Sequence, residues 1–321
     1  MNHSIHTKTH PTLKASLKAE TKMHDIIIIG GGPSGMTAAL YALRANKSVL
    51  ILEKENFGGQ IANSPKVENY PTIKEISGSD LTDRMVTQIM DNGAEFELEN
   101  VEKVQKNGEI FEVYTNYGMH ECKAVIIANG VKHRTLGLPK EEELIGKGVY
   151  YCAVCDGPMY KGKEAYLIGD ANTALQYAVL LSGYCTKVHM FCLFDHFFGD
   201  PVLQDRVRAK ENVFVTFNMN LVEYKGDNHL EGLVFENTQT HEKHEFKTDN
   251  VFVSVGQIPD NERFANIVDL ENGFILTDED MNTKTPGVYA CGDTRKKAIK
   301  QVVTACNDGA IAARSAVKYL N

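Results

Sequence analysis

The residues that follow Met23 alternate between strand, glycine-rich turn, helix and strand, and this order restricts the possible folds more than any other feature of the chain. We expect strands over residues 25–29 and 48–52 and a helix over residues 36–45. The turn between them is Gly30-Gly-Gly-Pro-Ser-Gly35, which fits the G-x-G-x-x-G pattern. A βαβ unit of this kind indicates an α/β fold built on a parallel sheet.

The glycine turn predicts a dinucleotide site. Gly30 permits the tight turn, Gly32 lets the backbone approach a pyrophosphate, and Gly35 allows close packing of the helix on the strand. The pyrophosphate is then held at the helix N-terminus. Glu53, at the end of the next strand, is the acid expected to accept hydrogen bonds from a ribose.

The same pattern recurs later in the chain. Residues 164–168 and 187–191 are expected strands around the turn 169–174 and the helix 174–182. We therefore predict two Rossmann-like dinucleotide-binding domains rather than one large sheet. Pro and Gly clusters at 136–140 and 256–261 indicate the crossings between domains. The predicted order is a disordered extension (1–22), the first domain (23–136), a central domain (137–260) and the remainder of the first domain (261–321).

Composition narrows the class of protein. The 321 residues include 34 Lys and Arg against 42 Asp and Glu, and a net charge of -8 argues against nucleic acid or an anionic membrane as the partner. No apolar run approaches the roughly 20 residues of a membrane span. Seven cysteines with one close pair, and no apolar leader, indicate a cytoplasmic protein.

The close pair is Cys152-Ala-Val-Cys155, followed by Asp156. A structural zinc site usually needs two such pairs, and His189 and Cys192 would point to opposite faces of a strand, so no metal is expected. A dithiol at this spacing can close to a disulfide, and the adjacent acid can move protons to and from a departing thiolate. We predict redox chemistry here; two unrelated buried cysteines are the alternative.

Over residues 23–321 the chain resembles the low-molecular-weight, bacterial-type thioredoxin reductases. The matching motifs are Gly30-Gly-Gly-Pro-Ser-Gly35, Gly58-Gly-Gln-Ile61, Glu68-Asn-Tyr-Pro71, Ala128-Asn-Gly130, Cys152-Ala-Val-Cys155-Asp-Gly157 and Cys291-Gly-Asp293 with Gln301 beyond it. The resemblance implies FAD in the first domain, a homodimer, and a thioredoxin or thioredoxin-like partner. It also implies that Cys155 takes electrons from the flavin, Cys152 attacks the partner disulfide and Asp156 is the acid/base.

The resemblance also implies a set of FAD contacts from both segments of the first domain. They are Gly30, Gly32, Pro33, Ser34, Gly35, Glu53, Gly59, Gln60, Asn69, Gly130, Gly292, Asp293, Lys300, Gln301 and Val302. The family usually has Arg-Gln-Ala where Lys300-Gln-Val stands here, so the cation is kept but the guanidinium is lost.

The second fingerprint departs further from the family pattern. Gly169-Asp-Ala-Asn-Thr-Ala174 places Ala171 where a pyrophosphate needs a bare backbone and adds the charge of Asp170. The position that corresponds to Glu53 is Cys192. The family's His-Arg-Arg-x-x-x-Arg stretch is here Cys192-Leu-Phe-Asp-His-Phe-Phe198, without arginine. We therefore predict that NADPH is not the electron donor and that NADH is also poorly bound.

Several interpretations stay open from the sequence. Leu193, Phe194, Phe197 and Phe198 either fill the vacated cleft or form a surface for a second flavin or a protein. Some relatives that lack the NADPH site take electrons from ferredoxin, an acidic protein that a basic patch would attract. The candidate docking residues are Arg295, Lys296, Lys297 and Lys300, with Lys132 and Arg134. The alternatives are a diflavin enzyme, a conventional NADPH-dependent reductase and a redox sensor without turnover.

Overall fold

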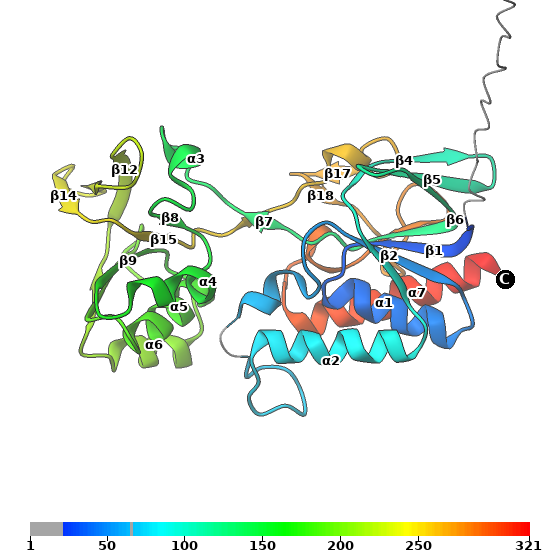
Figure 1. Cartoon of the computed structure of the whole chain (residues 1–321), viewed down its shortest axis with the longest axis horizontal. Coiled ribbons are helices and arrows are strands. Elements are labelled where there is room, and N and C mark those ends of the chain that lie inside the picture. The colour runs from blue at the N-terminus through cyan, green and yellow to red at the C-terminus, as the bar shows by residue number, and fades with distance from the viewer. Residues whose placement is uncertain (1–21, 65–66) are drawn as a thin grey trace, which may run out of the picture.

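Two lobes joined by a pair of crossing strands make up the part of the chain that the computed structural model describes, residues 22–64 and 67–321 (Figure 1). The crossing strands are β7 (Lys132–His133) and β16 (Gln257–Ile258), which pair antiparallel. β7 precedes the Pro and Gly cluster at 136–140, and β16 lies within the cluster at 256–261. The expected disordered extension falls outside the described residues, apart from Lys22.

The first lobe is organised around a sheet with strand order β3-β2-β1-β6-β5-β4, and β19 also pairs with β6. β3, β2, β1, β6 and β19 run parallel, whereas β4 and β5 form an antiparallel extension on β6. The strands are β1 (His24–Ile29), β2 (Val49–Glu53), β3 (Glu95–Leu98), β4 (Val101–Asn107), β5 (Ile110–Thr115), β6 (Met119–Ile127) and β19 (Val288–Ala290). The short pair β17 (Leu270–Glu271) and β18 (Phe274–Ile275) lies apart from this sheet.

Helices α1 (Pro33–Arg44), α2 (Gly78–Asp91) and α7 (Val302–Leu320) lie on one side of this sheet (Figure 1). β1 is buried on both faces, which its uninterrupted isoleucines permit, because a strand covered on both sides needs no polar alternation. α1 and α7 approach closely at Gly309, where an added Cβ would lie 2.2 Å from the Ser34 carbonyl oxygen. The short helices η1 (Gly59–Asn63), η3 (Glu262–Phe264) and η4 (Gly292–Thr294) complete the lobe.

The central lobe contains a parallel sheet with the order β11-β10-β9-β15-β8 and an antiparallel sheet with the order β12-β13-β14. The strands are β8 (Val149–Tyr150), β9 (Glu164–Ile168), β10 (Lys187–Phe191), β11 (Val213–Thr216), β12 (Met219–Lys225), β13 (Gly232–Asn237), β14 (Lys243–Lys247) and β15 (Val251–Val253). The helices are α3 (Glu141–Leu144), α4 (Ala153–Asp156), η2 (Gly157–Tyr160), α5 (Asn172–Ser182) and α6 (Pro201–Arg208).

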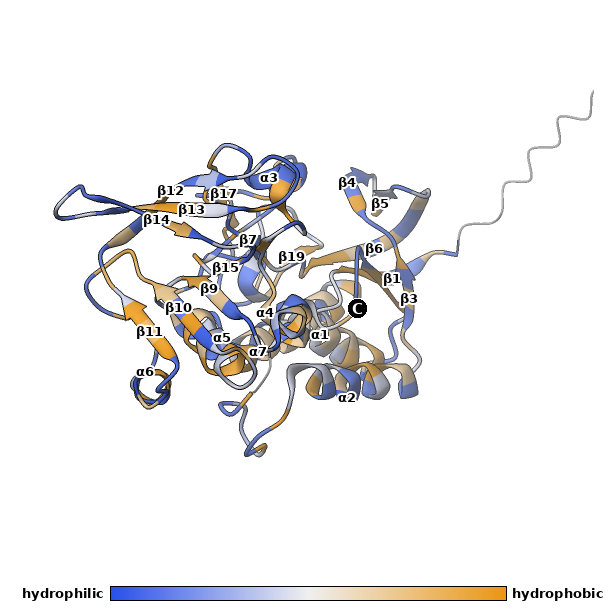
Figure 2. Cartoon of the chain, turned by 60° about the vertical axis from the view of Figure 1, so that its left-hand side comes forward, coloured by the Kyte–Doolittle hydropathy of each residue, from blue (hydrophilic) through white to orange (hydrophobic). Residues whose placement is uncertain are grey.

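The hydropathy of each element matches its position. Figure 2 shows hydrophobic residues along the strands of both lobes, whereas α2 shows mixed colouring as an amphipathic helix does. Among the described residues, no helix combines the length and the apolar character needed to cross a membrane. The structure therefore has the predicted fold class, an α/β protein with two Rossmann-like domains, one inserted in the other.

Candidate active site

The first glycine turn is shaped by backbone contacts that only glycine allows. Gly30 has φ +109°, and a Cβ there would lie 2.4 Å from the Ala128 carbonyl oxygen. At Gly35 a Cβ would meet the Gly30 carbonyl oxygen at 2.0 Å. A Cβ at Gly32, in contrast, would find its nearest neighbour only at 4.0 Å, so this position opens onto free space. The turn thus leaves the N-terminus of α1 accessible to an anionic ligand.

Glu53 closes this turn from the neighbouring strand. Its Oε2 accepts a hydrogen bond of 2.7 Å from the Gly31 N–H, and Oε1 accepts one of 3.0 Å from the Glu55 N–H. The side chain is buried, and each oxygen keeps a lone pair for a further donor. This is the geometry expected of a carboxylate that receives ribose hydroxyls.

A cavity of about 670 Å³ connects the predicted cofactor residues. The predicted residues that line it are Gly30, Gly32, Pro33, Ser34, Glu53, Gly59, Gln60, Asn69, Gly130, Asp293, Lys300, Gln301 and Val302. Gly35 and Gly292 do not line the cavity and instead support its wall by close packing against Gly30 and Ser34. Residues distant in the chain are therefore brought to a single site, whose volume lies within the range of ligand sites.

Residues that line the cavity contact one another both between and within the two segments of the first lobe. Asn69 Nδ2 donates to Gln301 Oε1 at 3.1 Å, and Gln60 Nε2 donates to the Val131 carbonyl oxygen at 3.5 Å. Gln301 also caps α7, since the Thr304 hydroxyl accepts from the Gln301 N–H at 3.1 Å. Burial lowers the pKa of Lys300, whose ammonium lies 3.6 Å from the centre of the Phe274 ring.

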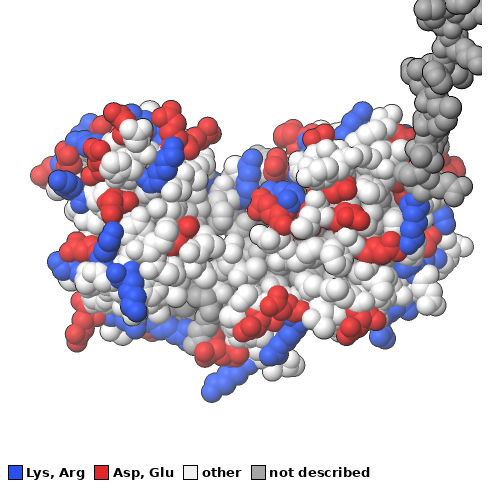
Figure 3. All heavy atoms as spheres, viewed as in Figure 1, with Lys and Arg blue, Asp and Glu red and all other residues white. Residues whose placement is uncertain are grey.

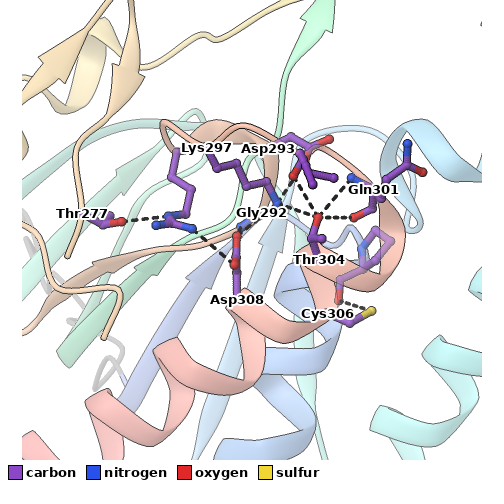
Figure 4. A network of polar contacts seen from close by, with 11 residues as sticks. Thr277, Gly292, Asp293, Lys297, Gln301, Thr304, Cys306 and Asp308 are labelled. Atoms are coloured by element: carbon purple, nitrogen blue, oxygen red, sulfur yellow. Dashed lines mark hydrogen bonds and ion pairs between the residues drawn. The ribbon is translucent and has the colours of Figure 1, made fainter. Parts of the chain in front are cut away.

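Asp293 provides a test of whether FAD fits the cavity. Its Oδ1 is buried and accepts no hydrogen bond from any described residue, although Lys297 Nζ lies 3.3 Å away as an ion-pair partner. Burial raises the pKa of Asp293, and the Lys297 charge opposes this rise. Oδ1 thus lies against Lys297 (Figure 4), whereas the side chain as a whole lines the cavity and keeps 29% of its surface exposed, so it can still accept a hydrogen bond from a hydroxyl of a bound cofactor. These residues fit FAD.

Several cavity residues were missed by the sequence reasoning: Lys54, Phe57, Asn129, His133, Asp260 and Arg263. Asn129 could have been predicted from the sequence, because it is the central residue of the family motif Ala128-Asn-Gly130. Its side chain donates to the Asn261 side chain at 3.0 Å and accepts from Thr294 at 2.8 Å, so it fixes three loops at the cavity floor. The others lie in loops or in the two- and three-residue elements β7 and η3, which are too short to show a periodic pattern.

The cysteine pair forms a disulfide at the start of α4. Cys152 and Cys155 are joined with Cα atoms 5.3 Å apart, and the Cys155 N–H donates to Cys152 Sγ at 3.1 Å. Cys155 is exposed and Cys152 is half-buried. Neither lines the cavity, but Cys155 Sγ lies 3.7 Å from Oδ1 of Asn63, which does line it. The disulfide therefore lies just outside the cavity.

Asp156 follows the disulfide and is half-buried, and this burial raises the pKa of its carboxyl group. A raised pKa suits a residue that must hold and release a proton beside a thiolate. Local packing fixes the turn, because Tyr184 donates to the Ala153 carbonyl oxygen at 3.4 Å and fills the space beside Gly157, where a Cβ would lie 2.1 Å from the Tyr184 hydroxyl.

The second fingerprint lacks the features of the first. Cys192, in the position of Glu53, donates from its Sγ to the Gly169 carbonyl oxygen at 3.4 Å instead of receiving an N–H. The Phe198 N–H donates to the Asp170 carbonyl oxygen at 2.8 Å, so the segment after β10 borders the turn. Asp200 Oδ2 accepts from Asn172 Nδ2 at 3.1 Å, which puts a carboxylate at the first residue of α5.

The apolar residues beside this fingerprint do not simply fill a vacated cleft, as one interpretation expected. Phe197 is buried and packs edge-on against Phe217 with ring centroids 5.1 Å apart. Leu193, Phe194 and Phe198 are 42%, 47% and 58% exposed. That interpretation is wrong for these three residues, which stay exposed because the backbone contact of Phe198 with Asp170 holds the segment beside the second glycine turn.

The predicted basic docking patch also needs correction. Lys297 is only 8% exposed and contacts Asp293 and Asp308, and Arg295 is 15% exposed and contacts Asp308. Neither can receive a protein partner, because α7 brings the Asp308 carboxylate beneath them. Lys132 and Lys296 remain 52% and 54% exposed. Figure 3 shows basic and acidic residues interspersed on the face in view.

Comparison with known proteins agrees with this geometry. The model of the family described as pyridine nucleotide-disulphide oxidoreductase matches residues 24–309. The thioredoxin reductase of Bacillus subtilis is 40% identical over 304 residues, covering 94% of this chain and 96% of the relative.

Solved structures give the same result. Lactococcus lactis thioredoxin reductase in its FR conformation has a TM-score of 0.89 at 34% identity, covering 92% of this chain and 99% of that chain. A ferredoxin-flavin thioredoxin reductase from Clostridium acetobutylicum has a TM-score of 0.53 at 30% identity, covering 93% and 98%. With an FAD-fitting cavity beside a Cys-x-x-Cys disulfide, the chain belongs to the bacterial-type thioredoxin reductases, which are FAD-dependent disulfide oxidoreductases.

Proposed function

We propose that this protein reduces the disulfide of a thioredoxin or thioredoxin-like protein with electrons that come from ferredoxin and not from NADPH. When bound, FAD accepts electrons one at a time and releases them as a pair. Cys155 receives the pair as its bond to Cys152 breaks, and the Cys152 thiolate then attacks the partner disulfide, which forms a mixed disulfide and frees one partner thiolate. Cys155 attacks Cys152 in that mixed disulfide, which frees the second partner thiolate and restores the Cys152–Cys155 bond. Asp156 supplies and removes the protons, so that two electrons and two protons convert the partner disulfide to a dithiol.

The observation that carries the choice of donor is the chemistry of the second fingerprint. The carboxylates of Asp170 and Asp200 stand at a turn where a nucleotide pyrophosphate needs a positive environment. Burial raises the pKa of Asp170, and the imidazole of His196, which itself contacts Asp195, opposes this rise only in part. Ala171 lines the cavity with a methyl group, whereas the equivalent position of the first fingerprint is Gly32 and has no side chain.

The arginines of α6 are engaged elsewhere. Arg206 forms a bidentate contact with Glu68 of the first lobe. Arg208 contacts Asp205 and Gln204, and its guanidinium lies 5.7 Å from the centre of the Phe197 ring. A 2′-phosphate would thus lose charge-assisted hydrogen bonds worth about 1.5–3 kcal/mol each.

Two observations favour ferredoxin as the donor. The second fingerprint lacks cationic contacts for the 2′-phosphate of NADPH, and the chain is similar to a ferredoxin-flavin thioredoxin reductase. Lys132, Arg134 and Lys296 are the exposed cations of the predicted patch, and Lys132 and Lys296 also lie near the carboxylates of Asp260 and Glu271. We further propose a homodimer in the cytoplasm, where a reducing environment keeps the free thiols Cys122, Cys185, Cys192, Cys291 and Cys306 from forming disulfides.

An anaerobic titration tests the donor. The flavin absorbance of the holoenzyme is followed during addition of NADPH, then NADH, then reduced ferredoxin. We expect an oxidised spectrum with both nucleotides and bleaching with ferredoxin. Rapid bleaching by micromolar NADPH would show that the enzyme is a conventional reductase. As a matched variant, Ala171→Gly with Leu193→Arg, Phe194→Arg and Phe198→Arg should gain NADPH-driven bleaching, because it restores the glycine and the three arginines of the family pattern.

A second candidate function rests on the exposed rings of Phe194 and Phe198, which meet edge-on with centroids 5.2 Å apart beside the second glycine turn. Such rings can stack on a second flavin that relays electrons to the first. The same purified holoenzyme decides this point. More than one flavin per chain after extraction supports the diflavin enzyme, and one flavin per chain contradicts it.

A further inference from the structure

The ammonium group of Lys297 is buried among polar groups that meet beneath the predicted flavin contacts (Figure 4). Its Nζ lies 3.3 Å from Asp293 Oδ1, 3.1 Å from Asp308 Oδ2 and 3.3 Å from Thr304 Oγ1. A buried lysine is costly unless it is paired, and here two carboxylates compensate it. The side chain therefore joins η4, where Asp293 lies, to the first turns of α7.

Asp308 anchors this arrangement from α7. Its Oδ2 accepts a hydrogen bond of 3.2 Å from the Gly292 N–H, directly before Asp293, and its Oδ1 lies 3.4 Å from Arg295 Nη1. Arg295 in turn donates from Nε to Thr277 Oγ1 at 2.8 Å. Asp308 is 5% exposed at its side chain, so these contacts are shielded from solvent. The backbone at Gly292 and the side chain of Lys297 are thus held by the same carboxylate.

Asp293 is the member of this group that faces the cavity. Its Oδ1 is buried against the Lys297 ammonium, while the side chain as a whole keeps 29% of its surface exposed. An isolated carboxylate at this depth would rotate toward solvent or take up a proton. The nearby ammonium group instead favours the ionised form, which is the better acceptor for a hydroxyl donor.

We propose that Lys297 is a positioning residue for FAD, which holds the Asp293 carboxylate ionised and oriented toward a hydroxyl group of the cofactor. Lys297 itself stays behind Asp293 and does not line the cavity. Its effect on the cofactor therefore passes through Asp293. The sequence does not distinguish the adjacent Lys296 and Lys297 as candidates for this role. In the structure Lys296 is 54% exposed and contacts Glu271 on the surface.

The test measures FAD affinity of the deflavinated protein by quenching of flavin fluorescence. The variants are Lys297→Met, Asp293→Asn and the double variant, with Lys296→Met as the matched surface control. We expect Lys297→Met to weaken FAD binding by about 10-fold to 100-fold, the range of a charge-assisted hydrogen bond. In the Asp293→Asn background the same change should alter affinity by less than about twofold, because the residue it acts through is already lost.

Thermal unfolding of each apoprotein separates positioning from a purely structural role. Lys297→Gln, which keeps a donor but no charge, serves where Lys297→Met does not fold, and its loss of affinity should be smaller. Unchanged FAD affinity in a folded Lys297 variant overturns the proposal. An equal loss of affinity in the unmodified and the Asp293→Asn backgrounds also overturns it, because Lys297 would then act independently of Asp293. Lys296→Met should bind FAD as the unmodified protein does.

Discussion

Asp156 follows the Cys152–Cys155 disulfide and is half-buried. Burial raises the pKa of this carboxyl group, so its acid form persists to higher pH than that of an exposed aspartate. We expect disulfide turnover to fall as pH rises through this raised pKa. Asp156→Asn should lower turnover by about 10²-fold to 10⁴-fold and remove this limb of the pH profile. Steady-state rates over a pH series check this, and an unchanged profile would contradict the role of Asp156.

The same residue has a predictable effect on stability. Because its folded-state pKa is raised, the contribution of Asp156 to stability is present below the unfolded-state pKa and is lost as pH rises through the folded-state pKa. At neutral pH Asp156→Asn should therefore have a Tm equal to or above that of the unmodified protein. Thermal unfolding at neutral and acidic pH measures this, and a lower Tm at neutral pH would speak against it.

The two cysteines should behave differently when they are replaced singly. With Cys155→Ser, Cys152 can still attack a partner disulfide, but no thiol remains to release the product. We expect a stable mixed disulfide with a thioredoxin-like protein, visible on a non-reducing gel. Cys152→Ser should give much less of it. Cys306→Ser, at a half-buried free cysteine, is the control and should keep normal turnover. Equal trapping by both single variants would contradict the assigned roles.

Single residues also show the limit of sequence reasoning. The glycines of the first turn and Glu53 follow from a motif because local backbone geometry requires them. The burial of Lys297 does not follow, since Asp308 reaches it only after α7 packs on α1. Two adjacent lysines look alike in the sequence, and only the tertiary partner of each decides which one is exposed.

At the scale of elements, the contact between α1 and α7 holds the C-terminal segment at the cavity. A Cβ at Gly309 would lie 2.2 Å from the Ser34 carbonyl oxygen and must push the helices apart. Gly309→Ala should cost about 1–3 kcal/mol and lower Tm by roughly 5 °C, with weaker FAD retention. Gly118→Ala is the control, because nothing lies within 4 Å of its added Cβ. Equal Tm values for the two variants would contradict this account.

The elements themselves were predicted unevenly. β9 and β10 have the expected bounds, whereas α1 begins at Pro33 and α5 at Asn172, before the expected starts. Both helices begin inside the glycine turn, because its last residues already form the first helical turn. The crossing strands β7 and β16 have two residues each, which is too short for any periodic signal.

At the scale of the whole molecule, a net charge of -8 would repel an acidic ferredoxin, so the proposed docking would depend on local cations. Lys132→Glu combined with Lys296→Glu should reduce ferredoxin-driven kcat/KM about tenfold at low salt, and high salt should remove the difference. Lys247→Glu, on β14 at the far end of the central lobe, is the control (Figure 1). A loss that persists at high salt, or none at all, would exclude this docking surface.

The pairing of β7 with β16 means that the chain leaves and re-enters the first lobe at neighbouring points. The central lobe is therefore an insertion between two neighbouring points of the first lobe, and replacing it would not need to move those two points. The second glycine turn belongs to this inserted lobe, although Ala171 lines the same cavity as Gly32 of the first turn. In this chain the first fingerprint keeps the contact between Glu53 and its glycine turn, whereas in the second fingerprint Cys192 stands in the place of that acid.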